Sequence, residues 1–175
     1  MHEKKRKKEK ATEGRCDMRR IEFCEYITAY KKQLYTVAYA ILKNEADAED
    51  AVCNAIQKGY EHLEQLRNPQ KFKPWMITII KNEALQIKRK RLELPGNEQV
   101  EAMLEPTQDS PHELWDVVQA LPEEYRLAIV LFYYNDLSIR DISKVLDIPI
   151  GTVKSRLNRG RELLRQALEK TDGGR

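Results

Sequence analysis

Residues 92–113, LELPGNEQVEAMLEPTQDSPHE, divide the chain into two parts of different character. The stretch has three prolines, one glycine and six acidic residues, and it has no lysine or arginine. It directly follows the basic run KRKR at 88–91, so composition and charge both change at this boundary. Such a stretch predicts a flexible acidic linker between two domains. A simple solvated spacer is an equally good interpretation from composition alone.

Both parts have the apolar spacing of amphipathic helices. Apolar side chains recur near the helical period from about Arg19 to Lys43, and again after Asn44 and after Phe72. Asn44 has Asp47 three positions later, which is typical of a helix N-cap. No segment alternates as a strand, so we predict an all-α protein of two small helical domains. The predicted segments are a tail (1–18), a first domain (19–91), the linker (92–113) and a second domain (114–172).

Composition argues against several classes of protein. No apolar run approaches the roughly 18 residues that span a bilayer, and the basic N-terminus lacks the apolar stretch of a secretory signal. Cys16, Cys24 and Cys53 are widely spaced, which favours reduced thiols in a cytoplasm. Cys24 and Cys53 fall in helical apolar patterns and are interpreted as small core residues. We expect no metal site, no cofactor and no catalytic constellation.

The first 18 residues are rich in lysine and nearly devoid of large apolar side chains. A segment of this composition cannot bury enough apolar surface to offset the entropy lost on ordering. We therefore predict a disordered basic tail. It would either attract nucleic acid weakly or serve only as a soluble extension.

The segment IPIGTVKSRLNRGRELL at 148–164 predicts a helix with two different faces. One face is an apolar stripe that must contact a core: Val153, Leu157, Gly160, Leu164 and Leu168. The opposite face is basic and polar: Lys154, Ser155, Asn158 and Arg159, with Arg156 beside them. The preceding SIRDISKVLD, capped by Ser138, completes the pattern of a helix-turn-helix, whose second helix reads the major groove. A solvated amphipathic helix is the alternative that periodicity leaves open.

Taken together, these segments resemble the extracytoplasmic-function (ECF) sigma factors, specificity subunits of bacterial RNA polymerase. ALPEEYRLAIVLFYYNDLSIRDISKVLDIPIGTVKSRLNRGRELLRQAL looks like sigma region 4 almost position for position. ADAEDAV followed by FKPWMITIIKNEAL is similar to region 2. Region-4-like helices also occur in response regulators, so the specificity comes from both halves in this order, over about residues 20–170. AVCNAI at 51–56 and Gln86 depart from the family's pattern.

The resemblance implies a factor that binds core polymerase, recognises −35 and −10 promoter elements and promotes promoter opening. Core polymerase would be contacted by Asp47, Asp50, Asn54 and Gln57. The −10 element would be melted by the first domain, and a flipped base would be held near Asn82. The residues that would contact this element are Leu66, Arg67, Asn68, Lys71, Phe72, Trp75, Lys81, Asn82, Lys88 and Arg89. Trp75 is better explained as a core anchor. The −35 element would be bound by Arg140, Thr152, Lys154, Ser155, Arg156, Asn158 and Arg159, with Arg140 and Thr152 on phosphates.

The resemblance also implies partners and a location. The partners are the largest and second-largest subunits of core RNA polymerase, promoter DNA and an anti-sigma factor, often membrane-tethered, with no small-molecule substrate. The location is the bacterial cytoplasm. Two other classes of protein are the alternatives: a two-domain helix-turn-helix regulator that acts without polymerase, and an enzyme with an appended DNA-binding domain. The basic third helix and acidic linker argue against the first, and the missing catalytic motifs argue against the second.

Overall fold

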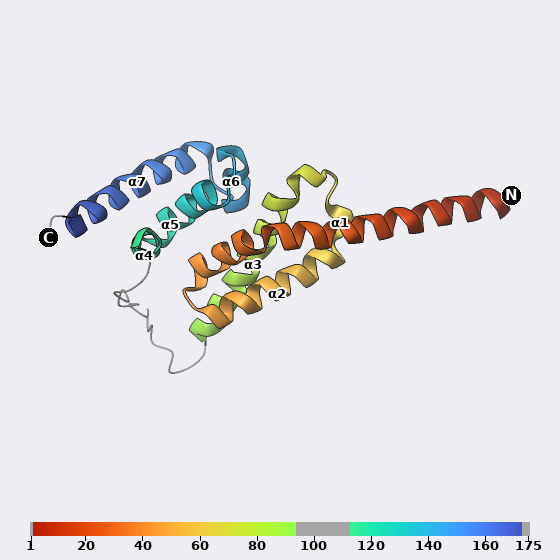
Figure 1. The fold of residues 1–175 in the computed structure, drawn as a ribbon, viewed down its shortest axis with the longest axis horizontal. Coiled ribbons are helices and arrows are strands. Elements are labelled where there is room, and N and C mark those ends of the chain that lie inside the picture. The colour runs from red at the N-terminus through yellow and green to blue at the C-terminus, as the bar shows by residue number, and fades with distance from the viewer. Residues whose placement is uncertain (1, 94–112, 173–175) are drawn as a thin grey trace.

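The computed structural model describes residues 2–93 and 113–172, with side chains described for residues 20–93 and 114–169. Within these ranges the chain is helical and has no β-strand, which confirms the all-α prediction. The N-terminal unit consists of α1 (His2–Leu42), α2 (Glu45–Glu61) and α3 (Phe72–Glu93). The C-terminal unit consists of α4 (Glu113–Ala120), α5 (Glu123–Ile129), α6 (Ile139–Leu146) and α7 (Ile150–Asp172). Figure 1 shows α1, α2 and α3 as one bundle and α4 to α7 beside it.

The three helices of the N-terminal unit pack against one another around a continuous apolar core. Small side chains on α2 (Ala48, Ala51 and Ala55) are fully buried, so this helix can lie close to its neighbours. The predicted cap is confirmed, because the Asn44 side chain accepts a hydrogen bond from the Asp47 backbone N–H at 2.9 Å. Two short 3-10 turns, Leu63–Gln65 and Pro69–Lys71, connect α2 to α3.

Residues 2–18 are helical and belong to α1. Lysine, glutamate and alanine, which are frequent in this segment, are good helix formers. One expectation for the N-terminal unit was wrong. Cys24 and Cys53 are exposed and are not core residues, because the buried sides of their helices carry neighbours such as Phe23 and Ala51.

The C-terminal unit is built around α5, which passes into a π-helical turn at Val130–Tyr134. Asn135 ends this turn: its backbone N–H and its side-chain amide both donate to the Val130 carbonyl, each at 3.1 Å. The predicted cap of α6 is also confirmed, since the Ser138 hydroxyl accepts from the Asp141 backbone N–H at 3.1 Å. The apolar helix that begins with α5 therefore ends at the polar Asn135, and the chain enters α6 at the polar Ser138.

The predicted stripe of α7 faces the core only along its first half. Val153 and Leu157 are buried, whereas Leu164 is half-buried and Leu168 is exposed. Along its second half the stripe borders an apolar groove of about 690 Å3 between α7 and the helices α4 and α5. Leu114, Val118, Ile129, Tyr134, Leu164 and Leu168 line this groove.

The two glycines of α7 offer a matched test of helix packing. A Cβ on Gly160 would lie 2.9 Å from Ile129 Cγ1, whereas a Cβ on Gly151 would meet no atom within 4 Å. We expect Gly151→Ala to raise the free energy of unfolding by about 0.5 kcal/mol through helix propensity. Gly160→Ala should give no gain, or a loss of about 1 kcal/mol, because Ile129 must move. Urea unfolding measures both variants, and equal stabilisation would contradict the close contact.

Candidate nucleic-acid interface

The helix-turn-helix is held rigid by hydrogen bonds across its turn. Asp147 ends α6 in a left-handed conformation, with φ 55° and ψ 49°. The Ser143 hydroxyl donates to the Ile148 carbonyl at 2.6 Å, and the Ile148 N–H donates back to the Ser143 carbonyl at 3.1 Å. Val153 and Leu157 then anchor α7 in the core. The exposed face of α7 is thus fixed relative to α6.

Four predicted reading residues, Lys154, Ser155, Asn158 and Arg159, share that exposed face of α7. Three of them are engaged within the helix. Ser155 donates to the Thr152 carbonyl at 3.0 Å, and Arg159 forms an ion pair with Glu162 at 2.7 Å. Asn158 accepts a hydrogen bond from Arg161. These contacts are exposed, so base edges can replace them at little cost.

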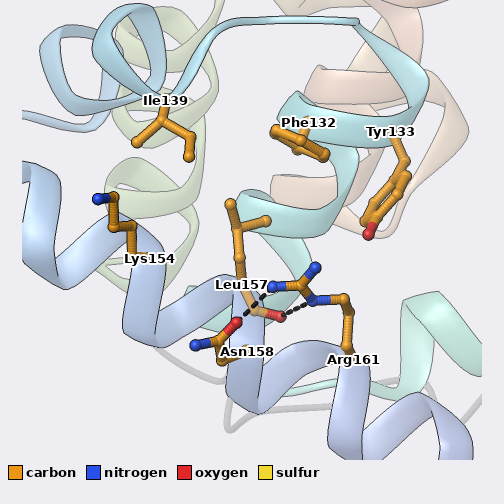
Figure 2. A pocket seen from close by; sticks show the side chains of 7 residues that line it. All are labelled: Phe132, Tyr133, Ile139, Lys154, Leu157, Asn158 and Arg161. Carbon is orange, nitrogen blue, oxygen red and sulfur yellow. Dashed lines mark hydrogen bonds between the residues drawn. The ribbon is translucent and has the colours of Figure 1, made fainter.

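A hollow of about 270 Å3 lies beside this face, and Figure 2 shows the side chains that line it. Lys154, Asn158 and Arg161 reach it from α7, while Phe132, Tyr133 and Ile139 reach it from the preceding segments. Arg161 bridges the Asn158 side chain and the Leu157 carbonyl. Sequence reasoning missed Arg161, although its spacing three residues after Asn158 places the two side chains together on a helix.

Two other residues of the predicted −35 group differ in their surroundings. Arg140 is exposed near the start of α6 and Thr152 is half-buried in the first turn of α7, where helix N-termini favour phosphate. Arg156 instead forms an ion pair with Glu124 of α5 at 3.1 Å. This ion pair connects α7 to α5, and the contact of Arg156 with DNA stays a prediction.

The predicted −10 residues lie along α3 and in the loop that precedes it. Arg67 and Asn68 are exposed in the loop, and Leu66 is half-buried. The Asn68 side chain accepts from the Gln70 backbone N–H at 3.0 Å, which shapes the loop. Asn82 and Arg89 are exposed on α3. These positions can meet DNA directly.

Phe72 does not fit the predicted DNA contact. It is 1% exposed, and its ring stacks on Tyr26 with centroids 4.8 Å apart. Phe23 and Trp75 pack against it at 5.6 and 6.0 Å. Phe72 lies at the start of α3, and the aromatic rings of α1 enclose it. It therefore anchors the end of the preceding loop to the core. Trp75 is half-buried in the same cluster, as expected of a core anchor.

Three of the predicted −10 cations contact the C-terminal unit. Lys71 bonds both Asp141 oxygens, at 2.9 and 3.1 Å. Lys81 donates to the Val145 carbonyl at 2.7 Å. Lys88 forms an ion pair with Glu123. The predicted cationic surface of α3 is therefore partly covered by α5 and α6.

The predicted polymerase-binding residues occupy α2. Asp50, Asn54 and Gln57 are exposed, and Asn54 and Gln57 border a groove between α2 and α3. Asp47 differs from them, because its carboxylate forms an ion pair with Arg91 at 2.6 Å. All four residues therefore lie on α2. Asp50, Asn54 and Gln57 are exposed to solvent, whereas Asp47 connects α2 to the end of α3.

Arg126 is a structural residue that sequence reasoning missed. It is 3% exposed, and its guanidinium donates to the carbonyls of Ala40 at 2.7 Å, Gln119 at 3.0 Å and Leu121 at 2.6 Å. Ala40 belongs to α1, so Arg126 connects the two units. The signal in the sequence is its place beside the apolar run LAIV, where an exposed arginine is unusual.

The ionisation of Asp141 should make stability depend on pH. Burial by itself would raise its pKa, but hydrogen bonds from Lys71 and Ser138 outweigh burial, and the pKa lies below the ordinary value of 3.8. A lowered pKa stabilises the folded state above pH 3.8, and this contribution is lost as the pH falls through the folded pKa. We expect wild type to exceed Asp141→Asn in melting temperature at pH 6, with the gap closing as the pH falls below 3.8. A gap that stays constant would contradict this linkage.

Among the described residues, no helix is long and apolar enough to cross a membrane. The same residues contain no group of three or more His, Cys, Asp or Glu side chains able to hold a metal ion.

The chain is similar to known proteins along most of its length. A family model described as Sigma-70 region 2 matches residues 26–92, and one described as Sigma-70, region 4 matches residues 112–164. The ECF RNA polymerase sigma factor SigW of Bacillus subtilis (strain 168) is 32% identical over 165 residues, covering 83% of this chain and 88% of SigW. The RNA polymerase sigma factor SigV of the same strain is 31% identical over 150 residues, covering 83% and 90%.

Solved structures share the fold. The sigma factor RpoE in complex with the anti-sigma factor NepR from Bartonella quintana has a TM-score of 0.73 at 24% identity, covering 84% of this chain and 96% of RpoE. CnrH in complex with the cytosolic domain of CnrY has a TM-score of 0.61 at 21% identity, covering 85% and 88%. These likenesses support the arrangement of helices described above.

Proposed function

We propose a division of labour within this chain, which belongs to the ECF group of the sigma-70 family. Members of this family recognise promoters and act with RNA polymerase, and they are initiation factors rather than catalysts. In our proposal the N-terminal unit binds core polymerase and opens the −10 element, while the C-terminal unit reads the −35 element. The match over residues 26–92 argues against a regulator that works without polymerase.

The −35 assignment is supported by the exposed face of α7. Lys154, Asn158 and Arg159 project from a helix that is anchored by buried Val153 and Leu157. Arginine and lysine pair with guanine in the major groove, and asparagine pairs with adenine. A rigid helix with these side chains is what direct readout requires. This face is the observation that carries the proposal.

The −10 assignment is supported by the loop and the exposed part of α3. Arg67 and Asn68 lie in the loop, and Asn82 and Arg89 lie on the helix that follows. The Phe72 cluster holds the loop in place, which leaves polar side chains free for unpaired bases. Basic side chains beside a fixed loop suit single-stranded DNA, where phosphate attraction and base contacts act together.

Polymerase binding is assigned to the exposed residues of α2, namely Asp50, Asn54 and Gln57. They are polar and lie on a single helix, so they can face one surface of the largest polymerase subunit. The second-largest subunit would meet the C-terminal unit, where the apolar groove beside α7 offers a contact surface. The linker would pass toward the RNA exit channel; its residues 94–112 lie outside those described.

An anti-sigma factor is proposed as the regulator. RpoE was crystallised with the anti-sigma factor NepR, and CnrH with the cytosolic domain of CnrY. We extend this kind of partner to our chain and propose that it acts in the cytoplasm, where a membrane-anchored partner could sequester it. The chain itself would carry no catalytic activity and use no cofactor.

Run-off transcription tests the proposal. Purified bacterial core RNA polymerase is mixed with the full chain and a library of genomic fragments. We expect discrete transcripts that core polymerase alone does not make. If no fragment yields initiation above the core-only level, the proposed function is wrong.

A further inference from the structure

We propose that Arg161 sets the base preference of the reading face of α7 by holding the side-chain amide of Asn158 in one orientation. Arg161 is then a positioning residue, which determines specificity through its neighbour. This inference rests on the proposed function of α7 and deepens it. It starts from two hydrogen bonds made by one guanidinium, both drawn in Figure 2.

The Arg161 guanidinium donates to two acceptors on the preceding turn of α7. Its Nε donates to the Leu157 carbonyl at 3.2 Å, and its Nη2 donates to the Asn158 Oδ1. Leu157 is only 3% exposed, so its carbonyl is a fixed point of the helix. Because the guanidinium is planar, the bond to Leu157 restricts where the bond to Asn158 can form. The Asn158 side chain is therefore tied to the rigid part of α7.

The two ends of the Asn158 amide differ in their chemistry. Oδ1 only accepts hydrogen bonds, and Nδ2 only donates them. A guanidinium has donors and no acceptor, so Oδ1 is the only end that can bond to Arg161. Turning the amide by half a rotation would place Nδ2 against the cation and lose the bond. Arg161 therefore selects the orientation in which Nδ2 points away from the guanidinium (Figure 2).

The orientation of this amide decides which base edge Asn158 can match. In the major groove, guanine offers two acceptors, thymine offers one acceptor, and adenine offers a donor beside an acceptor. An amide that rotates freely can adapt to any of these edges. An amide held in one orientation presents its donor and its acceptor at fixed places, so one base gains and the others lose. Arg161 should therefore sharpen discrimination at the position that Asn158 reads.

The place of Arg161 on α7 suits positioning better than direct reading. At about 100° per residue, Arg161 lies about 60° around the helix from Asn158, at the edge of the reading face. It borders the hollow whose opposite wall includes Phe132 and Tyr133. Within the described part of the chain, the residues that line this hollow include no carboxylate. No acidic side chain of the hollow therefore competes with Asn158 for the guanidinium.

Sequence selection tests the proposal. The full chain, alone and in complex with core RNA polymerase, selects from duplex DNA with a randomised −35 segment, and the bound DNA is sequenced. Asn158→Ala identifies the position that Asn158 reads, because the base preference there should disappear. Arg161→Met should narrow the preference for the best base at this position about two- to fivefold, the effect of one exposed polar contact. Preferences at the other positions should stay as in wild type.

Two further variants separate positioning from charge. Arg161→Lys keeps the positive charge but lacks the planar fork that reaches Leu157 and Asn158 together. It should bind DNA nearly as tightly as wild type and still narrow the preference at the Asn158 position. Arg165→Met removes an arginine one turn further along α7, where it pairs with Glu169, and should change no preference. If Arg161 only neutralised a phosphate, Arg161→Met would weaken binding to all sequences equally.

The double variant provides the decisive comparison. In the Asn158→Ala background, Arg161→Met should change the preference at no position, because the side chain that Arg161 positions is gone. A change there would show that Arg161 reads a base itself, and it would overturn the proposal. An Arg161→Met preference that does not narrow, an equal loss on all sequences, or intact preferences in Asn158→Ala would also overturn it.

Failure of the proposed function gives a different result. It appears in run-off transcription, whereas the role of Arg161 appears in the sequences selected by the chain alone. A chain that supports no initiation but shows the narrowed preference in Arg161→Met would reject the sigma-factor function and keep the positioning role. A wild-type chain that enriches no sequence, alone or with core polymerase, would overturn the positioning role.

Discussion

Replacing Arg126 with methionine is expected to lower the free energy of unfolding by about 3 kcal/mol. Methionine has a similar length and is apolar, but it cannot donate to the carbonyls of Ala40, Gln119 and Leu121. Those acceptors would stay buried without this donor, since Arg126 is only 3% exposed. Urea unfolding followed by circular dichroism measures the change.

The control for this variant is Arg140→Met, at an exposed position of α6. It removes the same charge and should change the free energy of unfolding by less than about 0.5 kcal/mol. Because Arg126 joins α5 to α1, its loss should also uncouple the units and broaden or split the unfolding transition. A single sharp transition of wild-type stability in Arg126→Met would show that these hydrogen bonds contribute little.

Helix ends and helix faces could be predicted from the sequence where a single side chain determines them. Asn44 and Ser138 have short acceptor side chains before apolar periodic segments, and both cap helices as predicted. Val153 and Leu157 follow the helical period and are buried. These features depend on neighbours within four residues, so the sequence contains all the information that they require.

Burial of single residues could not be predicted where tertiary contacts decide it. Phe72 begins α3 and has an exposed loop before it, but Tyr26 and Phe23 of α1 enclose it. Cys24 has apolar neighbours in sequence yet faces outward. Arg156 lies among the basic residues of the reading helix but pairs with Glu124. For Phe72 and Arg156 the deciding partner is distant in the chain.

The packing of the two units against each other lay beyond sequence reasoning for the same reason. Its contacts join Lys71 to Asp141 and Lys88 to Glu123, across 70 and 35 residues of sequence. Opposite charges on exposed helices have many possible partners, and no local pattern selects among them. Only the packing of the C-terminal unit on the N-terminal unit brings these pairs together.

Replacing Arg159 with alanine is expected to reduce initiation at a −35-dependent promoter by about 5- to 150-fold, which corresponds to about 1–3 kcal/mol for a good base contact. Arg159 is exposed on the reading face of α7, so its removal should not disturb the core. Run-off transcription measures initiation, and co-purification with core polymerase measures binding. Core binding should stay at the wild-type level, because Arg159 belongs neither to the proposed polymerase contacts on α2 nor to the residues that line the apolar groove beside α7.

Glu162→Gln separates the two possible reasons for such a loss. Arg159 pairs with Glu162 at 2.7 Å, so Arg159→Ala removes both a candidate base contact and an ion pair within α7. Glu162→Gln breaks the ion pair and leaves the guanidinium free to reach DNA. If Arg159 reads a base, Glu162→Gln should keep initiation within about twofold of wild type, because an exposed helical pair contributes little to stability. If instead both variants lose initiation equally, the ion pair is what matters, and the reading face of α7 has to be assigned to Lys154 and Asn158 without Arg159.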